Sequence, residues 1–173
     1  MTEIVIFVWI KLNKMQKMFS LLFTVICLQT SAQTLRTTYS DDFSRWDFDG
    51  QQYRTTYSND FFSWDVNGIR IRSTYSKDPG SWDIGNSTKL RTTYSNDLSR
   101  WEIRGNSKTI YVKTTYSNDF SRWDVSGDAS GSMRTTYSND YDRWDIQVKF
   151  EGVPDEMKYA VVFVPIYISN KQK

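Results

Sequence analysis

The chain lacks histidine altogether and has a single cysteine, Cys27, in a segment that we expect to be cleaved off. The absence of histidine excludes catalysis by Ser-His-Asp and Cys-His groups. Once Cys27 is removed, only oxygen atoms remain as metal ligands. A mature chain without cysteine forms no disulfides, so its core and its backbone hydrogen bonds alone must hold the fold together.

The chain also lacks a surplus of charge of either sign. It has 22 Lys and Arg against 20 Asp and Glu, and removal of residues 1–32 leaves 19 of each. The cations alternate with acids along the sequence, so they do not form the basic patch that binds nucleic acid. We therefore expect no nucleic-acid partner.

Residues 1–32 differ in composition from the rest of the chain. Lys17 precedes an apolar run over residues 18–28, and small residues close the segment. This layout is typical of a secretory signal peptide that starts at Met15 or Met18, and it resembles bacterial signal peptides at its end. Its apolar core is too short for a stable membrane span, although a retained anchor is the alternative. The mature protein is expected to be secreted, periplasmic or on the cell surface, without a membrane span.

One motif, whose clearest copy reads RTTYSNDFSRWDV, is repeated six times in the remaining chain. Each copy has Tyr, then Asp three residues later, then Trp seven after the Tyr, followed by an acid and a β-favouring apolar residue. The Tyr-to-Trp distance is constant, whereas successive Trp residues are 18, 18, 19, 22 and 21 residues apart. A repeat with a period near 20 residues is characteristic of repeat architectures, so it is the first guide to the fold. The tyrosines are Tyr39, Tyr57, Tyr75, Tyr94, Tyr116 and Tyr137, and the tryptophans are Trp46, Trp64, Trp82, Trp101, Trp123 and Trp144.

The constant and the variable spacing together predict two short strands per copy. Residues 35–40 and 45–48 of the first copy alternate apolar and polar side chains, as half-buried strands do. Asn67 and Gly68 form a pair preferred in two-residue hairpin turns, which places Trp64 opposite Ile71. The corresponding Asp-Gly turn of the first copy places Trp46 opposite Tyr53 by the same reasoning.

The fixed connection is expected to be a four-residue loop over residues 41–44, with Tyr39 opposite Trp46. Tyr and Trp would then share one apolar face with the neighbouring aliphatic residues. Such a face must be covered, so residues 33–146 are predicted to form an all-β domain. The predicted fold is an antiparallel meander of six two-stranded hairpins, about 12 short strands, which either closes like a barrel or stacks as an array of hairpins.

Residues 147–173 depart from the repeat. The last repeat strand is expected to continue to Phe150, and residues 152–155 to form a turn. Residues 159–168 are apolar on both faces and are interpreted as a further strand, with Pro165 at an edge or a bulge. We interpret this segment as a C-terminal capping strand; a strand that docks a partner is the alternative.

The repeated acids are first interpreted as turn caps that accept backbone N–H groups. Calcium on these turns is conceivable, but no copy has the alternating carboxylates of a calcium loop. An active site is normally singular, whereas these acids recur in all copies, so we expect neither an enzyme nor a metal or other cofactor. The six acids are Asp42, Asp60, Asp78, Asp97, Asp119 and Asp140.

Two functions fit these observations. The first is a non-catalytic structural, adhesive or protein-binding module of the cell surface, with all six Trp buried. The second is a multivalent carbohydrate-binding protein, in which some Tyr or Trp stays exposed next to an Asp at several equivalent sites. The candidate partners are accordingly a cell-surface protein or a polysaccharide. The candidate ligand-binding residues of the second function are Tyr39, Asp42, Trp46, Tyr94, Asp97, Trp101, Tyr116, Asp119 and Trp123.

Overall fold

The computed structural model of the protein describes residues 32–58, 60–138 and 140–172. The predicted signal peptide, apart from its last residue, lies outside the described residues. The described chain forms twelve strands and one long helix, α2. The elements are β1 (Gln33–Thr37), β2 (Arg45–Phe48), β3 (Gln51–Thr55), β4 (Ser63–Val66), β5 (Ile69–Ser73), β6 (Ser81–Ile84), β7 (Thr88–Thr92), β8 (Arg100–Gly105), β9 (Lys108–Thr114), β10 (Arg122–Gly127), β11 (Ser130–Thr135), β12 (Arg143–Lys149) and α2 (Asp155–Gln172).

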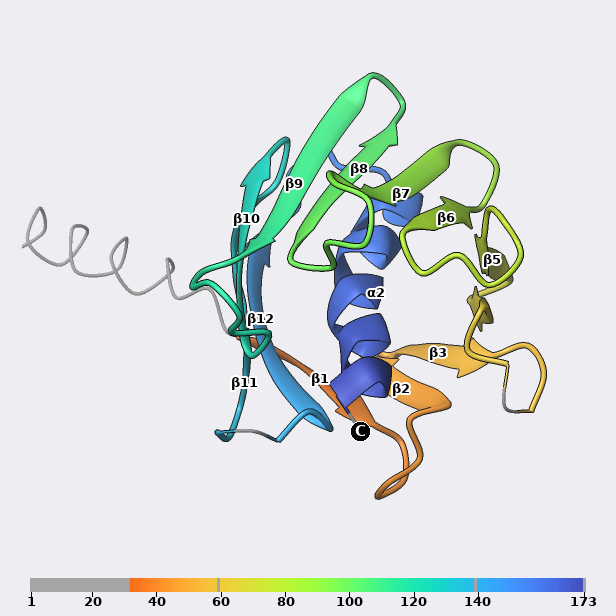
Figure 1. Cartoon of the computed structure of the whole chain (residues 1–173), viewed down its shortest axis with the longest axis vertical. Helices are drawn as coiled ribbons and strands as arrows, with labels where there is room; N and C mark the ends of the chain where they lie inside the picture. The colour runs from red at the N-terminus through yellow and green to blue at the C-terminus, as the bar shows by residue number, and fades with distance from the viewer. Residues whose placement is uncertain (1–31, 59, 139, 173) are drawn as a thin grey trace, which may run out of the picture. The chain divides into compact units, whose positions relative to one another are not determined.

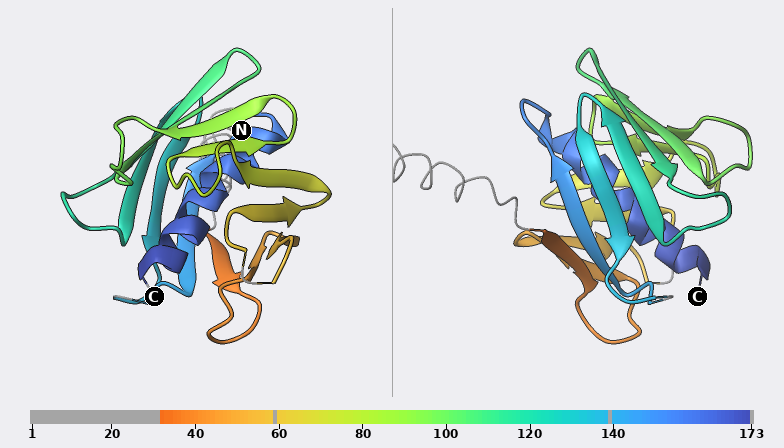
Figure 2. Two further views of the ribbon diagram at one scale, coloured as in Figure 1. Left: turned by 45° about the vertical axis from the view of Figure 1, so that its right-hand side comes forward. Right: turned by 90° about the vertical axis from the view of Figure 1, so that its left-hand side faces the viewer.

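The twelve strands follow one another in sequence order around a closed antiparallel barrel (Figures 1 and 2). β1 pairs with β12, with Leu35 opposite Trp144, and this pairing closes the sheet. The predicted meander of six hairpins is therefore confirmed, in its closed form. Closure leaves no unpaired strand edge in the sheet.

The variable turns have the predicted register. Trp46 lies opposite Tyr53, and Trp64 lies opposite Ile71. At the first of these turns Asp49 and Gly50 have φ values of 49° and 73°, which is the left-handed conformation that a two-residue type I′ turn requires at both positions. The turn residues thus set which side chains face the interior of the barrel.

The fixed hairpins have a different register from the predicted one. Thr37, not Tyr39, lies opposite Trp46, and the connection extends over residues 38–44. A slip of two residues keeps each strand residue on its predicted face, so Trp46 and Phe48 still point inward. The tyrosine, however, leaves the sheet and belongs to the loop.

The C-terminal strand prediction is wrong, because residues 159–168 lie within helix α2. Pro154 precedes the helix, and its carbonyl oxygen accepts hydrogen bonds from the backbone N–H groups of Met157 and Lys158 at 3.0 and 3.1 Å. A proline is tolerated at this position, just before the first helical residue, because its missing N–H would have no partner within the helix. Two acids occupy the first turn, where they interact favourably with the helix dipole. A helix that is apolar on all sides is stable only when it is buried on all sides.

Helix α2 passes through the interior of the barrel, as both figures show (Figures 1 and 2). A barrel of eight strands is just filled by its own side chains, so a twelve-stranded barrel needs additional material inside. An α-helix, about 10–12 Å across with its side chains, supplies this material. Its Phe163 and Tyr167 rings contact the Trp82 ring edge-to-face, with centroids 4.8 and 4.9 Å apart.

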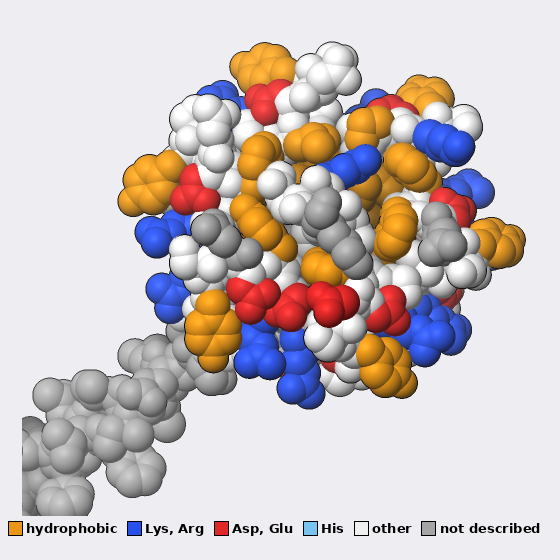
Figure 3. Space-filling model, turned by 60° about the horizontal axis from the view of Figure 1, so that its bottom comes forward, with side chains coloured by type: hydrophobic (Ala, Val, Ile, Leu, Met, Phe, Trp, Pro, Cys, Tyr) orange, Lys and Arg blue, Asp and Glu red, His pale blue; other side chains and the backbone are white. Residues whose placement is uncertain are grey.

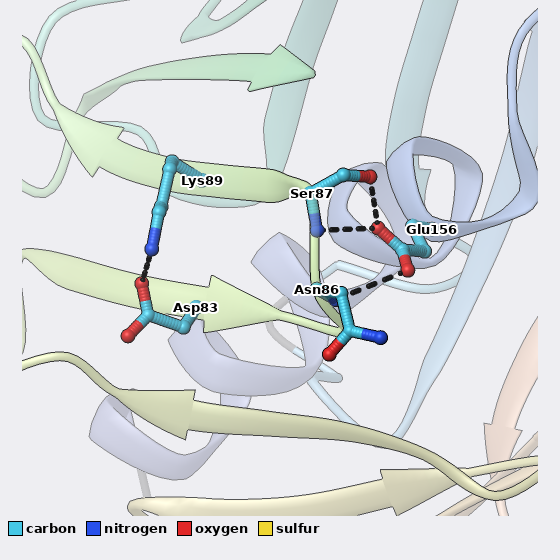
Figure 4. Close-up of polar contacts among 5 residues, drawn as sticks. All are labelled: Asp83, Asn86, Ser87, Lys89 and Glu156. Atoms are coloured by element: carbon cyan, nitrogen blue, oxygen red, sulfur yellow. Dashed lines mark hydrogen bonds and ion pairs between the residues drawn. The ribbon is translucent and has the colours of Figure 1, made fainter. Parts of the chain in front are cut away.

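Both ends of α2 are attached to the barrel by hydrogen bonds. At its start, the Glu156 carboxylate accepts bonds from the backbone N–H groups of Asn86 and Ser87, both at 3.2 Å, and from the Ser87 hydroxyl at 2.7 Å (Figure 4). Near its end, the Trp144 indole N–H donates to the Ser169 hydroxyl at 3.0 Å. These contacts fix the helix along the barrel axis.

Candidate functional site: a crown of tyrosine loops

The six fixed loops lie at one end of the barrel, because successive turns of an antiparallel meander alternate between its two ends. Helix α2 ends on the same side, where Asn170 lines a hollow of about 270 Å³ together with Asp42, Phe43, Ser58 and Phe61. We call these six loops and their tyrosines the tyrosine crown. The loops are residues 38–44, 56–62, 74–80, 93–99, 115–121 and 136–142, with residues 59 and 139 outside the described part of the chain.

Each loop contains two consecutive tight turns, which the fourth copy illustrates. The Asp97 backbone N–H donates to the Tyr94 carbonyl oxygen at 3.1 Å, and Asn96 between them has φ of 63°. A turn with positive φ at its third residue favours Gly or Asn there. The Asp97 carboxylate then accepts the Ser99 backbone N–H at 2.9 Å, which makes an Asx turn. Because the residues after Tyr94 form these two turns, Tyr94 lies in the loop and outside the strand.

The turn-capping interpretation of the repeated acids is confirmed. All six accept a backbone N–H from the residue two positions later, at 2.8–3.2 Å. The end of each loop is also bonded to the end of the strand that leads into the next loop: the Thr55 backbone N–H donates to the Ser44 carbonyl oxygen and that of Thr114 to the Ser99 carbonyl oxygen, at 3.0 and 2.9 Å. The loops are therefore held in place both internally and by their neighbours.

The tryptophans of the motif lie under the crown. All six are at most 1% exposed, and in five of them the indole N–H donates to the carbonyl oxygen three residues earlier, as from Trp101 to Leu98 at 2.8 Å. Only Trp144 differs, since it donates to Ser169 on α2. The tryptophans thus belong to the core and also hold the base of each loop.

The tyrosines of the motif are on the surface. Their exposed fractions lie between 58% and 68%, and the only other large hydrophobic residue that is exposed among the described ones is Tyr111, on the outer wall of the barrel. Figure 3 shows hydrophobic side chains that stand out from the surface, with acidic and basic side chains between them (Figure 3). The Arg100 guanidinium lies 6.0 Å from the centroid of the Tyr94 ring, within the range of a cation–π contact.

Three acidic side chains of the crown have pKa values that differ from the ordinary value of a carboxyl group. Hydrogen bonds from the Ser99 hydroxyl and backbone N–H lower the pKa of Asp97. A hydrogen bond from the Ser121 hydroxyl likewise lowers the pKa of Asp119. Partial burial raises both pKa values, but by less. The pKa of Asp142 is instead raised by its hydrogen bond with Asp140 and by partial burial. Protonation of the crown therefore differs from loop to loop.

The structure separates the residues that the carbohydrate-binding prediction grouped together. In each of the three copies it named, the Tyr is exposed, the Asp caps its loop and the Trp is buried in the core. A ligand at the surface can therefore contact the Tyr ring, but not the Trp ring. The three copies are those of Tyr39, Asp42 and Trp46, of Tyr94, Asp97 and Trp101, and of Tyr116, Asp119 and Trp123.

The remaining crown tyrosines, Tyr57, Tyr75 and Tyr137, were not among the predicted site residues although they are equally exposed. The sequence contains a signal for all six, because each Tyr is followed by Ser and, three positions after the Tyr, by Asp, with Asn between them in four copies, and these are turn-forming residues. A turn that begins at the Tyr places its ring outside the sheet. Weighting this signal above the strand-like alternation would have identified the crown.

Among the described residues, no three or more Asp and Glu side chains are grouped so that they could hold a metal ion. In the same part of the chain, no helix is both long enough and apolar enough to cross a membrane. Comparisons with models of protein families, with curated proteins and with solved structures find no match to this chain.

Proposed function

We propose that this protein is an exported, non-catalytic binding module that contacts a protein of the cell surface through its tyrosine crown. The observation that carries the proposal is the exposure of all six repeat tyrosines at one end of a closed barrel. A tyrosine ring contributes large contact area at low cost in side-chain entropy, and its hydroxyl can form a hydrogen bond with a partner.

The composition of the loops supports the same proposal. Tyr, Ser and Asn are the residues that enrich the binding loops of antibodies, where Tyr provides rigid contact area and Ser and Asn provide adaptable hydrogen bonds. Binding residues are commonly placed on loops that a rigid scaffold positions. The barrel around α2 is such a scaffold, and the Asp caps keep each loop in one conformation.

Carbohydrate binding is the second candidate function, and it is favoured by the six equivalent pairs of an exposed Tyr and a neighbouring Asp. Several weak and equivalent sites would act together on a repetitive polysaccharide. Two facts count against it: the Trp rings are buried, and one oxygen of each Asp already accepts a hydrogen bond within its own loop. Protein binding is therefore the preferred function.

Photo-cross-linking tests the proposal. Tyr94 in the crown and Tyr111 on the outer wall, which is 47% exposed, are replaced separately by p-benzoylphenylalanine, and the protein is irradiated on cells of its source. We expect a discrete cross-linked protein from position 94 and none from position 111. Excess unmodified protein should suppress this product, whereas a variant with all six crown tyrosines changed to Ser should not.

Identical products from both positions, or none from position 94, would contradict protein binding through the crown. A glycan array, probed with the unmodified protein and with the six-fold Tyr→Ser variant, addresses the second candidate. Glycan binding that depends on the tyrosines, without a cross-linked protein, would establish carbohydrate binding instead. Thermal unfolding of the variant serves as the control for folding.

A further inference from the structure

The six copies of the motif differ in the charges that they place next to the tyrosine crown. The residue before the Trp is Arg in four copies, but it is Ser in the second and third. In the first and sixth copies the loop before this Arg has an additional acid, Asp41 or Asp142. The fourth and fifth copies, which are neighbours in the barrel, have the Arg without an additional acid. Their arginines are Arg100 and Arg122.

The charge balance differs accordingly between the three pairs of neighbouring copies. The fourth and fifth copies, residues 91–125, have six Lys and Arg against four Asp and Glu. The second and third, residues 54–84, have four of each. The sixth and first copies, which are neighbours because β12 pairs with β1, have four Lys and Arg against six Asp over residues 134–146 and 36–48. The fourth and fifth copies therefore form the cationic side of the barrel.

The cations of this side lie on the outer wall, directly after the crown loops. Arg100 and Arg122 are the first residues of β8 and β10, and both are exposed because the Trp that follows each of them points inward. Exposed Lys113 lies between them on β9, opposite Arg100. The Arg100 guanidinium is 6.0 Å from the centroid of the Tyr94 ring. Three cations on three successive strands thus adjoin the part of the crown that contains Tyr94 and Tyr116.

The fold does not require these arginines. Arg100 lies opposite Lys113 and Arg122 opposite Arg134, and like charges directly opposite each other destabilise a sheet. The second and third copies have Ser at the same position and still form the hairpin, with Ser63 opposite Arg72. Their loops are also capped in the same way, by Asp60 and Asp78, which accept backbone N–H groups at 3.0 and 2.8 Å. A contact outside the chain would give Arg100 and Arg122 a role that folding does not.

The acids of the cationic side have hydrogen-bond partners other than these two arginines. Each carboxylate accepts a bond from a group nearby in its own copy or strand, so it is already partly satisfied without Arg100 or Arg122. These bonds are from Ser99 N–H to Asp97 and from Ser121 N–H to Asp119, both at 2.9 Å, from Arg104 to Glu102 at 2.8 Å, and from Thr115 to Asp124 at 3.2 Å.

We propose that the crown meets its partner with the cationic side, and that the partner is a protein that presents Asp and Glu side chains to Arg100, Lys113 and Arg122. This inference rests on the proposed function of the crown. A guanidinium forms two parallel hydrogen bonds with a carboxylate, and Tyr together with Arg is the typical composition of interface hot spots. Tyr94 and Tyr116 supply the contact area, and the three cations select an acidic partner.

Fluorescently labelled poly-L-glutamate is a suitable probe of the cationic side, because its only charged groups along the chain are carboxylates on a polypeptide. Its binding to the purified protein is followed by fluorescence anisotropy at about 50 mM salt, where charges still interact over more than 10 Å. We expect binding that falls steeply as the salt concentration rises to about 0.5 M, because surface charge pairs are screened.

Two double variants locate the binding. Arg100→Ser with Arg122→Ser introduces the residue that the second and third copies already have, and it should weaken binding at least about fivefold. Arg70→Ser with Arg72→Ser is the matched control, because it removes the same charge from exposed positions of β5, outside the cationic side. The control should weaken binding by less than about twofold. Thermal unfolding verifies that both variants are folded.

The proposal is overturned if poly-L-glutamate does not bind at about 50 mM salt, or if the two double variants weaken its binding equally. Dextran sulfate is titrated in parallel as an anionic polysaccharide. Binding of dextran sulfate without binding of poly-L-glutamate would also overturn the proposal, and would assign the cationic side to a polysaccharide.

Cross-linking on cells separates this inference from the proposed function. p-Benzoylphenylalanine is placed at Tyr94, on the cationic side, or at Tyr75, in the third copy, which is 64% exposed. We expect the cross-linked protein from position 94 and little from position 75. Equal products from both positions would overturn the role of the cationic side and leave protein binding through the crown intact. No product from either position would overturn both.

Discussion

At the scale of single residues, the two aromatic side chains of the motif have opposite environments. The tryptophans are buried around α2, and the tyrosines seven positions earlier are exposed. The sequence predicted that both rings belong to the core, because both fall on the same side of an ideal alternation. The interpretation is correct for Trp and wrong for Tyr, since the strand ends two residues before the Tyr.

A pair of substitutions in the fourth copy tests this difference. Trp101→Ala should lower the free energy of unfolding by about 3–5 kcal/mol, because it removes a large ring from a closely packed core. Tyr94→Ala, seven residues away and 59% exposed, should change it by no more than about 0.5 kcal/mol. Urea unfolding measures both. A loss below about 1 kcal/mol for Trp101→Ala would show that its ring is not part of the core.

The capping acids predict how stability depends on pH. The pKa values of Asp97 and Asp119 are lower in the folded chain than the value near 3.9 of an unfolded one, because hydrogen bonds from their own loops favour the charged form. Their contribution is therefore fully present above about pH 4 and is lost as the pH falls through the folded-state pKa. Asp142, with a raised pKa, has the opposite effect.

Unfolding in urea between pH 7 and pH 2.5 should thus show a decrease in stability at the acidic end. Asp97→Asn should weaken this pH dependence, because Asn keeps an acceptor for the Ser99 backbone N–H but does not titrate. Asp142→Asn should not weaken it, because the folded-state pKa of Asp142 is shifted in the other direction. An unchanged pH profile for Asp97→Asn would contradict the proposed role of the cap.

At the scale of elements, the repeat was largely predictable and the C-terminal segment was not. Turn residues such as Asn67 and Gly68 determine the hairpin register locally, so the sequence was sufficient for them. Residues 159–168 are rich in β-branched side chains and apolar on both faces, and such a pattern does not distinguish a buried strand from a buried helix. Pro154 and the two acids after it did mark a helix start. The choice between strand and helix depends on the interior of the barrel, and this interior exists only once the sheet has closed.

The attachment of α2 to the barrel can be tested at Gly85. This residue has φ of 57°, and a Cβ atom there would lie 2.1 Å from the Glu156 carboxylate. Gly85→Ala should therefore displace the Glu156 side chain in addition to straining the backbone. Gly50→Ala is the matched control, because Gly50 has a similar φ of 73° but no atom within 4 Å of the added methyl group.

Thermal and urea unfolding compare the two variants. Gly50→Ala should lower the free energy of unfolding by about 1–2 kcal/mol, which is the cost of the left-handed conformation. Gly85→Ala should lower it by at least about 1.5 kcal/mol more, because hydrogen bonds to a charged group are lost as well. Equal effects of the two substitutions would indicate that Glu156 does not secure the helix.

At the scale of the whole molecule, the barrel and the helix depend on each other. Twelve short strands enclose a space that their own side chains would not fill, and the helix is too apolar to remain in water. The six Trp rings and the rings of α2 fill this space together. The core takes the six Trp of the repeat, whereas its six Tyr lie at the surface.

Hydroxyl-radical footprinting with mass spectrometry is the most direct test of this division, because one experiment reports on both kinds of ring. We expect rapid oxidation at the tyrosines of the crown, such as Tyr94, and protection of the six tryptophans of the repeat and of buried Tyr53 and Tyr167. Tryptophans that are oxidised as fast as the crown tyrosines, or crown tyrosines that are protected in the isolated protein, would contradict this division.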